Sequence, residues 1–91
     1  MAEIRKKVWP EYFEKIVSGK KKFELRLGDF ECKEGDVLVL EEYNLKTKSY
    51  TGRKIKKKVS FVLKTKELKF WTKEEIDKYG FIVVSLEDVH S

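Results

Sequence analysis

The stretch Gly19-Lys20-Lys21-Lys22-Phe23-Glu24-Leu25-Arg26 contains the point at which a predicted helix gives way to a predicted strand. Before it, apolar side chains recur at helical spacing over residues 12–17, and Pro10 suits the first turn of that helix. Gly19 is the expected helix end. After it, apolar and charged residues alternate over residues 22–27, which predicts a half-buried strand.

The rest of the chain predicts short strands and helices around one small core. We predict strands at residues 4–8, 37–40, 55–63 and 81–86, the second covered on both faces, with a polar loop or loose hairpin at 43–52. Lys57 interrupts the apolar side of its strand and suggests a bulge or a barrel rim there. Thr72 and Glu75 fit a capping box that starts a second short helix, ended by Gly80. This pattern predicts one α+β, mainly β domain over residues 1–91, built as a small barrel with two short helices.

The composition favours an anionic partner. Lys and Arg number 21 against 16 Asp and Glu, which gives a net charge of +5 and a pI near 9.3. Nucleic acid is the first candidate for a protein with this balance. A chain that is 41% charged also has the composition of heat-adapted proteins, so thermal adaptation alone is the competing explanation.

Lys21, Glu24 and Arg26 are the strongest candidates for a site. Strand geometry places Glu24 and Arg26 on one face, about 6–7 Å apart at their Cα atoms. Lys21 has the wrong parity for that face unless the turn from helix to strand is still irregular there. Arg26 suits a phosphate or carbonyl, Glu24 a base N–H group or proton, and Lys21 general-base or nucleophilic chemistry. A surface ion-pair ladder is the alternative.

A second candidate is the run of basic residues at 53–58. On a strand, Lys54, Lys56 and Lys58 form a basic stripe suited to a phosphate backbone, with Arg53 beside it. An edge strand that uses Lys to avoid aggregation would look the same. Tyr50 lies in a polar segment nearby and is the aromatic residue best placed to stack on a base.

Four motifs taken together resemble the ASCH family of PUA-like β-barrels. The first is G-x-K-x-x-E-x-R, with Gly19, Lys21, Glu24 and Arg26 in place; the others are residues 9–13 (WPEYF), 34–38 (EGDVL) and 50–53 (YTGR). The resemblance implies a PUA-like barrel with a cleft, beside the signature segment, that takes RNA or a modified nucleoside. We therefore expect Lys21, Glu24, Arg26, Tyr50, Arg53 and the basic stripe to bind such a ligand, and Arg26→Ala to weaken binding more than Lys6→Ala.

Some ASCH relatives resemble amidohydrolases that remove the acetyl group of acetylcytidine. Their catalytic set combines a signature Lys with a Thr and a later Glu. Lys21 matches the Lys, Glu24 stands where the Thr is expected, and Glu74 or Glu75 corresponds to the later Glu. An enzyme of this class, with Lys21, Glu24 and Glu74 in catalytic roles, is the alternative to a binding domain. The third hypothesis is a barrel that interacts with another protein.

The sequence contains few residues that could form a metal site, a cofactor site or a disulfide. Cys32 and His90 are single representatives of their types, so we expect no metal site and no cofactor. A lone cysteine excludes an internal disulfide and suits a reducing compartment. No signal segment or membrane-spanning run is evident. We expect a cytoplasmic protein, without a membrane partner, with a monomer favoured.

Overall fold

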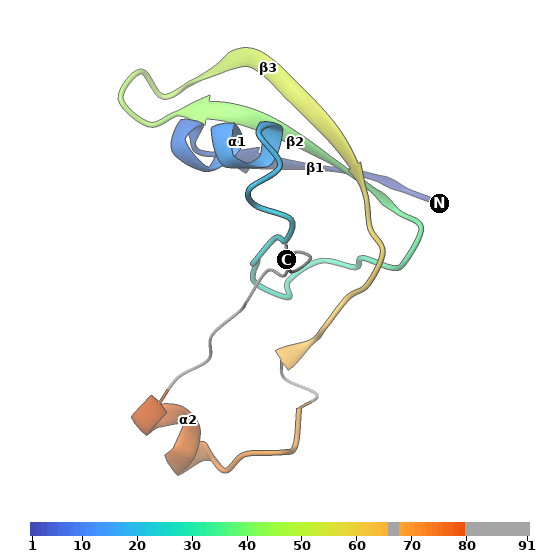
Figure 1. The fold of residues 1–91 in the computed structure, drawn as a ribbon, viewed down its shortest axis with the longest axis vertical. Coiled ribbons are helices and arrows are strands. Elements are labelled where there is room, and N and C mark those ends of the chain that lie inside the picture. Colours follow the sequence, from blue (N-terminus) through green and yellow to red (C-terminus); the bar gives the residue numbers. More distant parts are fainter. Residues whose placement is uncertain (66–67, 80–91) are drawn as a thin grey trace, which may run out of the picture.

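The computed structural model describes residues 1–65 and 68–79. Its elements in chain order are β1 (Glu3–Val8), α1 (Pro10–Val17), β2 (Val37–Asn44), β3 (Ser49–Lys58) and α2 (Lys73–Tyr79) (Figure 1). The three strands form one mixed sheet in the order β1-β2-β3, with β1 parallel and β3 antiparallel to β2. The fold class is α+β, as the sequence predicts.

Helix α1 supplies most of one face of the core. Pro10 occupies the first turn, where its missing N–H is no loss, and the chain leaves the helix through Gly19 at φ +80°. The apolar spacing then directs Phe13 and Ile16 toward the sheet. They pack with three strand residues into a small buried cluster: Val8, Leu38 and Leu40.

Strand β2 is central, with one strand on each side, and the middle of its apolar run is buried. Among the described residues, only its α1-facing side is covered by another element, so the prediction of cover on both faces holds for one face. Leu38 and Leu40 face α1, whereas Val39, with the opposite parity, is also only 3% exposed. On the α1-facing side the register places Lys6 and Ile55 beside Leu40. The same register places the whole basic stripe on the opposite face, as its alternation predicts.

The segment expected to be a polar loop or loose hairpin is an ordered hairpin. Tyr43 pairs with Tyr50 and Asn44 with Ser49. The Asn44 side-chain oxygen accepts hydrogen bonds from the backbone N–H groups of Lys46 and Thr47, at 2.8 and 3.3 Å, which fixes the turn.

The register irregularity of this hairpin lies near Gly52 and not at Lys57. Between Glu41 and Tyr43 the pairing shifts, and Gly52 in the opposing segment has φ +93°. Lys57 pairs regularly with Leu38. The prediction of a bulge at Lys57 is therefore wrong, because the apolar pattern breaks there without any extra residue in the ladder.

The predicted strand over residues 22–27 is also wrong. Within residues 1–65 and 68–79 this segment has no sheet partner, and Leu25 and Leu27 are 67% and 81% exposed. After Gly19 the chain is still tied to the helix end, since the Lys21 N–H donates to the carbonyl oxygen of Lys15 at 2.9 Å. The alternation in this stretch therefore does not reflect a half-buried strand.

The predicted strand at 55–63 stops early for a topological reason. Lys58 pairs with Val37, the first residue of β2, so residues beyond it have no partner strand in the described sheet. The last backbone bonds join Val59 to Asp36 and Gly35 at 2.8 and 2.9 Å. Phe61 is 70% exposed as a result.

The capping box of α2 is confirmed. The Thr72 N–H donates to Glu75 Oε1 at 2.9 Å, and the Glu75 N–H donates to Thr72 Oγ1 at 3.1 Å. The predicted helix end at Gly80 and the predicted strand at 81–86 lie outside the described residues. Over residues 1–65 and 68–79 the strands form an open three-stranded sheet, so the predicted barrel is not closed within these residues. No helix in this part has the length and apolarity needed to cross a bilayer.

Candidate ligand-binding site

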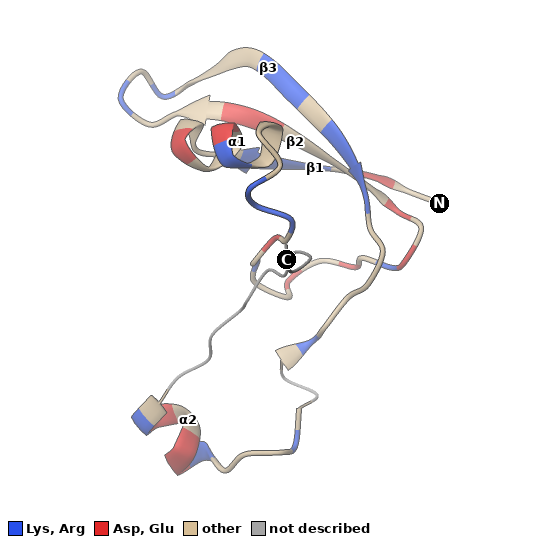
Figure 2. Cartoon of the chain, viewed as in Figure 1, with Lys and Arg blue, Asp and Glu red and all other residues tan. Residues whose placement is uncertain are grey.

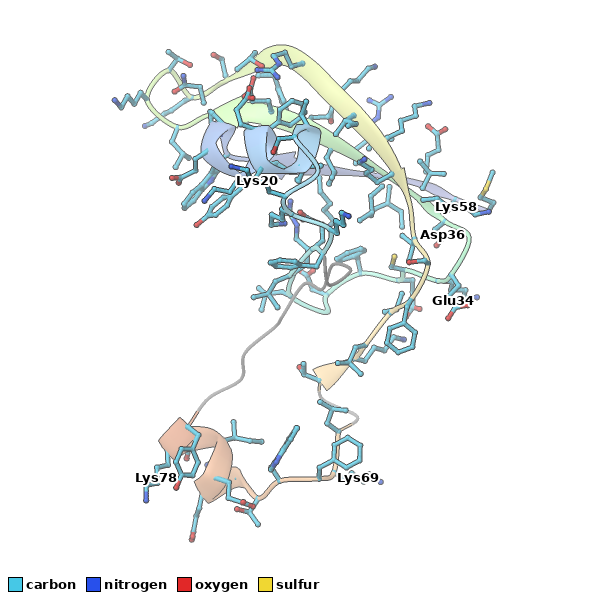
Figure 3. The ribbon with its side chains drawn as sticks, viewed as in Figure 1. Lys20, Glu34, Asp36, Lys58, Lys69 and Lys78 are labelled. Carbon is cyan, nitrogen blue, oxygen red and sulfur yellow. The ribbon has the colours of Figure 1, made fainter. Side chains whose placement is uncertain are left out.

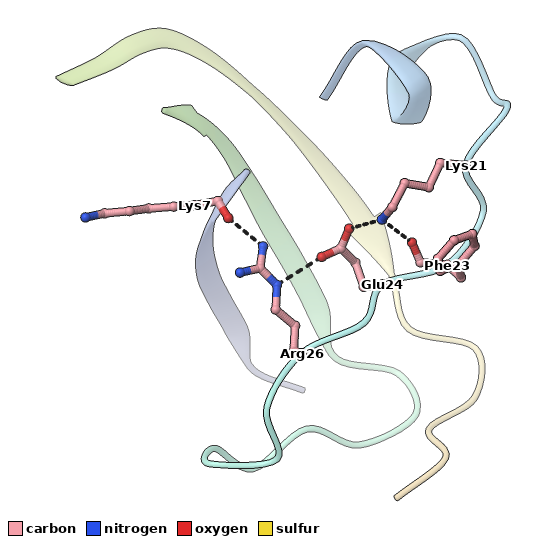
Figure 4. A network of polar contacts seen from close by, with 5 residues as sticks. All are labelled: Lys7, Lys21, Phe23, Glu24 and Arg26. Atoms are coloured by element: carbon pink, nitrogen blue, oxygen red, sulfur yellow. Dashed lines mark hydrogen bonds and ion pairs between the residues drawn. The ribbon is translucent and has the colours of Figure 1, made fainter. Parts of the chain in front are cut away.

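Lys21, Glu24 and Arg26 form one connected network, shown in Figure 4. The Lys21 ammonium donates to Glu24 Oε1 and to the Phe23 carbonyl oxygen, each at 2.6 Å. Arg26 Nε donates to the other Glu24 oxygen at 3.0 Å. The Lys21 and Glu24 side chains are only 15% and 17% exposed. The arrangement is therefore a half-buried, carboxylate-centred triad and not a loose surface ladder.

The backbone explains why Lys21 belongs to this network. Its N–H is bonded to the end of α1, so the chain has not yet become extended at this position. The parity rule for strands does not apply there. The structure thus supports the irregular-turn alternative, and Lys21 reaches the same carboxylate as Arg26.

Arg26 is held against the edge of the sheet. Its Nη2 group donates to the carbonyl oxygen of Lys7 at 2.5 Å, and Lys7 belongs to β1, whose outer edge has no strand neighbour in the described sheet (Figure 4). A side chain therefore uses a backbone acceptor that a further strand would otherwise occupy. This contact connects the signature segment to the sheet in place of a strand ladder.

An open pocket of about 350 Å³ adjoins the network. Arg26 lies in its wall, with the neighbouring residues Leu25, Leu27, Asp29 and Phe30 and, from β1, Lys6. The Lys6 ammonium lies 3.6 Å from the centroid of the Phe30 ring. The pocket thus combines two cations, one carboxylate and three apolar side chains, and its exposed lining is mainly polar, which suits a small polar ligand.

Sequence reasoning missed Lys6 and Phe30. Lys6 was expected to be a cation outside the site, yet the structure places it in the same pocket wall as Arg26. Its apolar-facing parity in β1, shared with Ile4 and Val8, was the available signal. The ammonium group of a lysine on the α1-facing side of the sheet needs a polar or aromatic partner or an opening to solvent, such as a pocket.

Arg53 belongs to a different cluster. Its Nη1 group bonds Glu14 Oε1 of α1 at 2.5 Å and lies 3.8 Å from Glu42 Oε2, while its guanidinium is 4.9 Å from the Phe13 ring centroid. The hydrogen bond to Glu14 raises the pKa of Arg53 above its ordinary value. Glu42 is 5% exposed and accepts the Thr51 hydroxyl at 2.6 Å. This cluster holds α1 to the hairpin.

The other predicted residues lie apart from the network. Lys54, Lys56 and Lys58 are on the sheet face away from α1, and Tyr50 lies near Tyr43 at a ring-centroid distance of 5.1 Å. Glu74 is on α2, which Figure 1 shows well separated from α1 and the sheet. Glu75, on the same helix, is engaged in the capping box. The structure therefore brings together Lys21, Glu24 and Arg26, and adds Lys6 to them.

The turn before β2 is held by hydrogen bonds to the Asp36 side chain. Asp36 accepts the backbone N–H groups of Ala2 and Lys33 at 3.0 and 2.9 Å, which lowers the pKa of its carboxyl group (labelled in Figure 3). Partial burial, and then the Asp36 charge, raise the pKa of the Cys32 thiol. Among the described residues there is no cluster of potential metal ligands.

Comparison with protein families gives one finding. A family described as a domain of unknown function (DUF3850) matches residues 5–76. The chain belongs to this family. The DUF3850 match begins within β1 and ends within α2, so it includes the network, the pocket and the hairpin. No curated protein and no solved structure matches the chain.

Proposed function

We propose that this DUF3850 domain binds RNA or a nucleotide-like ligand at the pocket beside the Lys21–Glu24–Arg26 network, in the manner expected of a PUA-like ASCH domain. The observation that carries the proposal is the placement of Arg26. One carboxylate and one backbone carbonyl orient its guanidinium at the wall of the pocket. A fixed guanidinium is well suited to a phosphate or to a base carbonyl oxygen.

The pocket wall supplies the other contacts that a nucleotide needs. Lys6 adds a second cation, and Asp29 adds an acceptor for base or ribose donors. Leu25 and Leu27 supply apolar surface for the face of a base, while Phe30 lies under the Lys6 ammonium and holds that cation at the pocket. A volume of about 350 Å³ is at the small end of ligand sites, which suits one nucleoside.

The geometry gives less support to an amidohydrolase. Both Glu24 oxygens already accept hydrogen bonds from cations, so a water activated by Glu24 would have to displace one of them. Attack by Lys21 as a neutral amine would require loss of its ion pair with Glu24. Glu74 lies on the separated helix α2 (Figure 1). Binding is therefore the function we favour.

An amide NMR titration of the labelled full chain tests this proposal. One titration uses an unstructured single-stranded RNA about ten nucleotides long; a second uses acetylcytidine. We expect shifts centred on residues 21–30 and on Lys6. Arg26→Gln should abolish these shifts, whereas Lys22→Gln, an exposed neighbour with the same charge change, should preserve them.

Three results would decide against the proposal or modify it. Equal behaviour of the Arg26 and Lys22 variants would exclude the pocket as the binding site. No shift with either ligand at low salt would exclude the nucleic-acid function and favour a protein-interaction domain. Growth of free acetate with acetylcytidine, lost in Lys21→Ala, would establish the hydrolase instead.

A further inference from the structure

The sheet face away from α1 is a second surface with its own chemistry. Register and alternation assign to it one set of side chains from each strand, which together we call the open sheet face: Glu3, Arg5, Lys7, Val37, Val39, Glu41, Tyr43, Tyr50, Lys54, Lys56 and Lys58. A cross-strand contact confirms this assignment, since Lys56 of β3 bonds Glu3 of β1 at 3.1 Å.

The open sheet face is strongly basic. It holds five cations and two carboxylates, and the exposed cations form rows along both outer strands. Figure 2 shows the basic segments along β3. Of the two carboxylates, Glu3 is ion-paired with Lys56 and Glu41 lies opposite Lys54 in the register. Lys58, at the far end of the strand, has neither carboxylate as its ion-pair partner and remains available to a ligand. Lys58 is labelled at the end of the strand in Figure 3. The charge complements a polyanion.

The hairpin end of this face carries two aromatic rings. Tyr43 and Tyr50 meet edge to face, with an interplanar angle of 79°. The Lys7 ammonium lies 4.3 Å from the Tyr43 centroid and 5.7 Å from that of Tyr50. Tyr50 is 53% exposed, and its partner ring limits its rotation. An exposed, braced aromatic ring beside a row of cations is what a nucleobase stacks on.

We propose that the open sheet face binds single-stranded nucleic acid, with its phosphates on the rows of cations and a base stacked on Tyr50. The inference rests on the proposed function in assuming a nucleic-acid ligand, and it adds a second surface to the pocket. The aromatic end distinguishes this surface from one for a simple polyanion, because polyphosphate or a lipid headgroup has no base to stack.

Lys7 joins the two surfaces. Its carbonyl oxygen accepts the Arg26 guanidinium at the β1 edge, and its ammonium lies over the tyrosine pair on the open sheet face. A single-stranded nucleic acid that places one nucleotide in the pocket can therefore continue around the β1 edge. The pocket would read one nucleotide, and the open sheet face would add affinity without sequence preference.

Adjacent lysines on β3 provide a matched test of the face. Lys58 belongs to the open sheet face, and Lys57, which is also exposed, has the opposite parity. We would measure the anisotropy of fluorescein-labelled oligouridylate, about ten nucleotides long, over a salt series. Lys58→Ser should raise Kd about threefold and reduce the salt slope by about 0.7. Lys57→Ser should change both much less. Equal effects would overturn the inference.

The tyrosine tests the nucleic-acid part of the inference. Tyr50→Leu should raise Kd about tenfold, while Tyr50→Phe, which keeps the ring, should leave Kd nearly unchanged. If Tyr50→Leu has no effect on Kd, the inference is wrong. It is also wrong if Tyr50→Leu weakens competition by inorganic polyphosphate as much as it weakens oligouridylate binding, because the face is then a general polyanion or protein surface.

Arg26→Gln separates the two proposals in the same assay. One outcome is that Arg26→Gln raises the Kd for oligouridylate while Lys58→Ser and Lys57→Ser have equal effects. The pocket proposal then stands and the open sheet face is rejected. If Lys58→Ser and Tyr50→Leu weaken binding while Arg26→Gln does not, the open sheet face stands and the pocket is rejected. Absence of oligouridylate binding by the unmodified chain at low salt rejects the open sheet face, and the acetylcytidine titration then decides the pocket.

Discussion

Arg26 donates a hydrogen bond to the Lys7 carbonyl oxygen at 2.5 Å, so a charged side chain holds the signature segment against the outer edge of β1. The bond replaces the strand ladder that the alternation at residues 22–27 suggests. It also leaves the Lys7 side chain free to lie over Tyr43 on the opposite sheet face. One backbone position thus connects the pocket to the open sheet face.

Glu24→Gln should lower the free energy of unfolding by about 1–3 kcal/mol. The carboxylate is 17% exposed and bridges two cations, which would repel each other once its charge is removed. Urea denaturation measures the change. Glu31→Gln, an exposed substitution in the same loop region, is the control and should cost much less. Equal costs would mean that the triad contributes nothing to stability.

Thr51→Val should destabilise the protein by about 1–3 kcal/mol, because it removes the hydroxyl donor of a buried carboxylate. Glu42 is 5% exposed and accepts that hydroxyl at 2.6 Å, while Arg53 lies farther away at 3.8 Å. Thr51→Ser retains the donor and should cost far less. Thermal unfolding of both variants measures the difference, and a serine variant as unstable as the valine variant would show that packing and not the hydrogen bond matters.

Asp36 should make stability depend on acid pH. Backbone N–H groups of Ala2 and Lys33 lower its pKa in the folded state, so its stabilising contribution is complete above the unfolded-state value of about 3.9. The contribution is lost as pH falls through the lower, folded-state pKa. Asp36→Asn should therefore be less stable than the unmodified chain at neutral pH, with a difference that shrinks on acidification. Asp77→Asn, exposed on α2, should lack this behaviour; a pH-independent difference would contradict the assignment.

Cys32 should react slowly with thiol reagents at neutral pH. Partial burial, followed by the Asp36 charge, raises the pKa of the thiol and lowers the fraction of reactive thiolate. We expect a slower reaction with a disulfide reagent in the folded chain than in the same chain unfolded in urea. Asp36→Asn should accelerate the folded reaction. A folded thiol as fast as the unfolded one would show that it is not shielded.

Local patterns in the sequence were sufficient for several elements. The spacing of residues 12–17, with Pro10 and Gly19, determined α1 at both ends, because caps and periodicity act within one or two turns. The continuous apolar run at 37–40 marked the central strand, and the Thr72–Glu75 pair marked the start of α2. The alternation of residues 54–58 placed the basic stripe on one face.

Strand partnership was decided only by the tertiary structure. Alternation at 22–27 and beyond Lys58 resembles that of β3, yet neither segment has a neighbouring strand in the described sheet. A strand needs backbone partners that lie far away in the sequence, and no local pattern reports whether they are present. The hairpin at 44–49 shows the reverse case, in which a polar segment is ordered by its partner.

The sequence by itself determined the chemistry of the candidate site: a Lys, a Glu and an Arg in one short segment. Only the tertiary structure decided their geometry. The helix end holds Lys21 out of strand parity, and the β1 edge orients Arg26. The tertiary structure also determines that Lys6 lines the pocket and that Arg53 pairs with Glu14 of α1. The basic stripe lies on the sheet face away from α1. These are long-range contacts, which depend on how helix and strands pack and not on residue spacing.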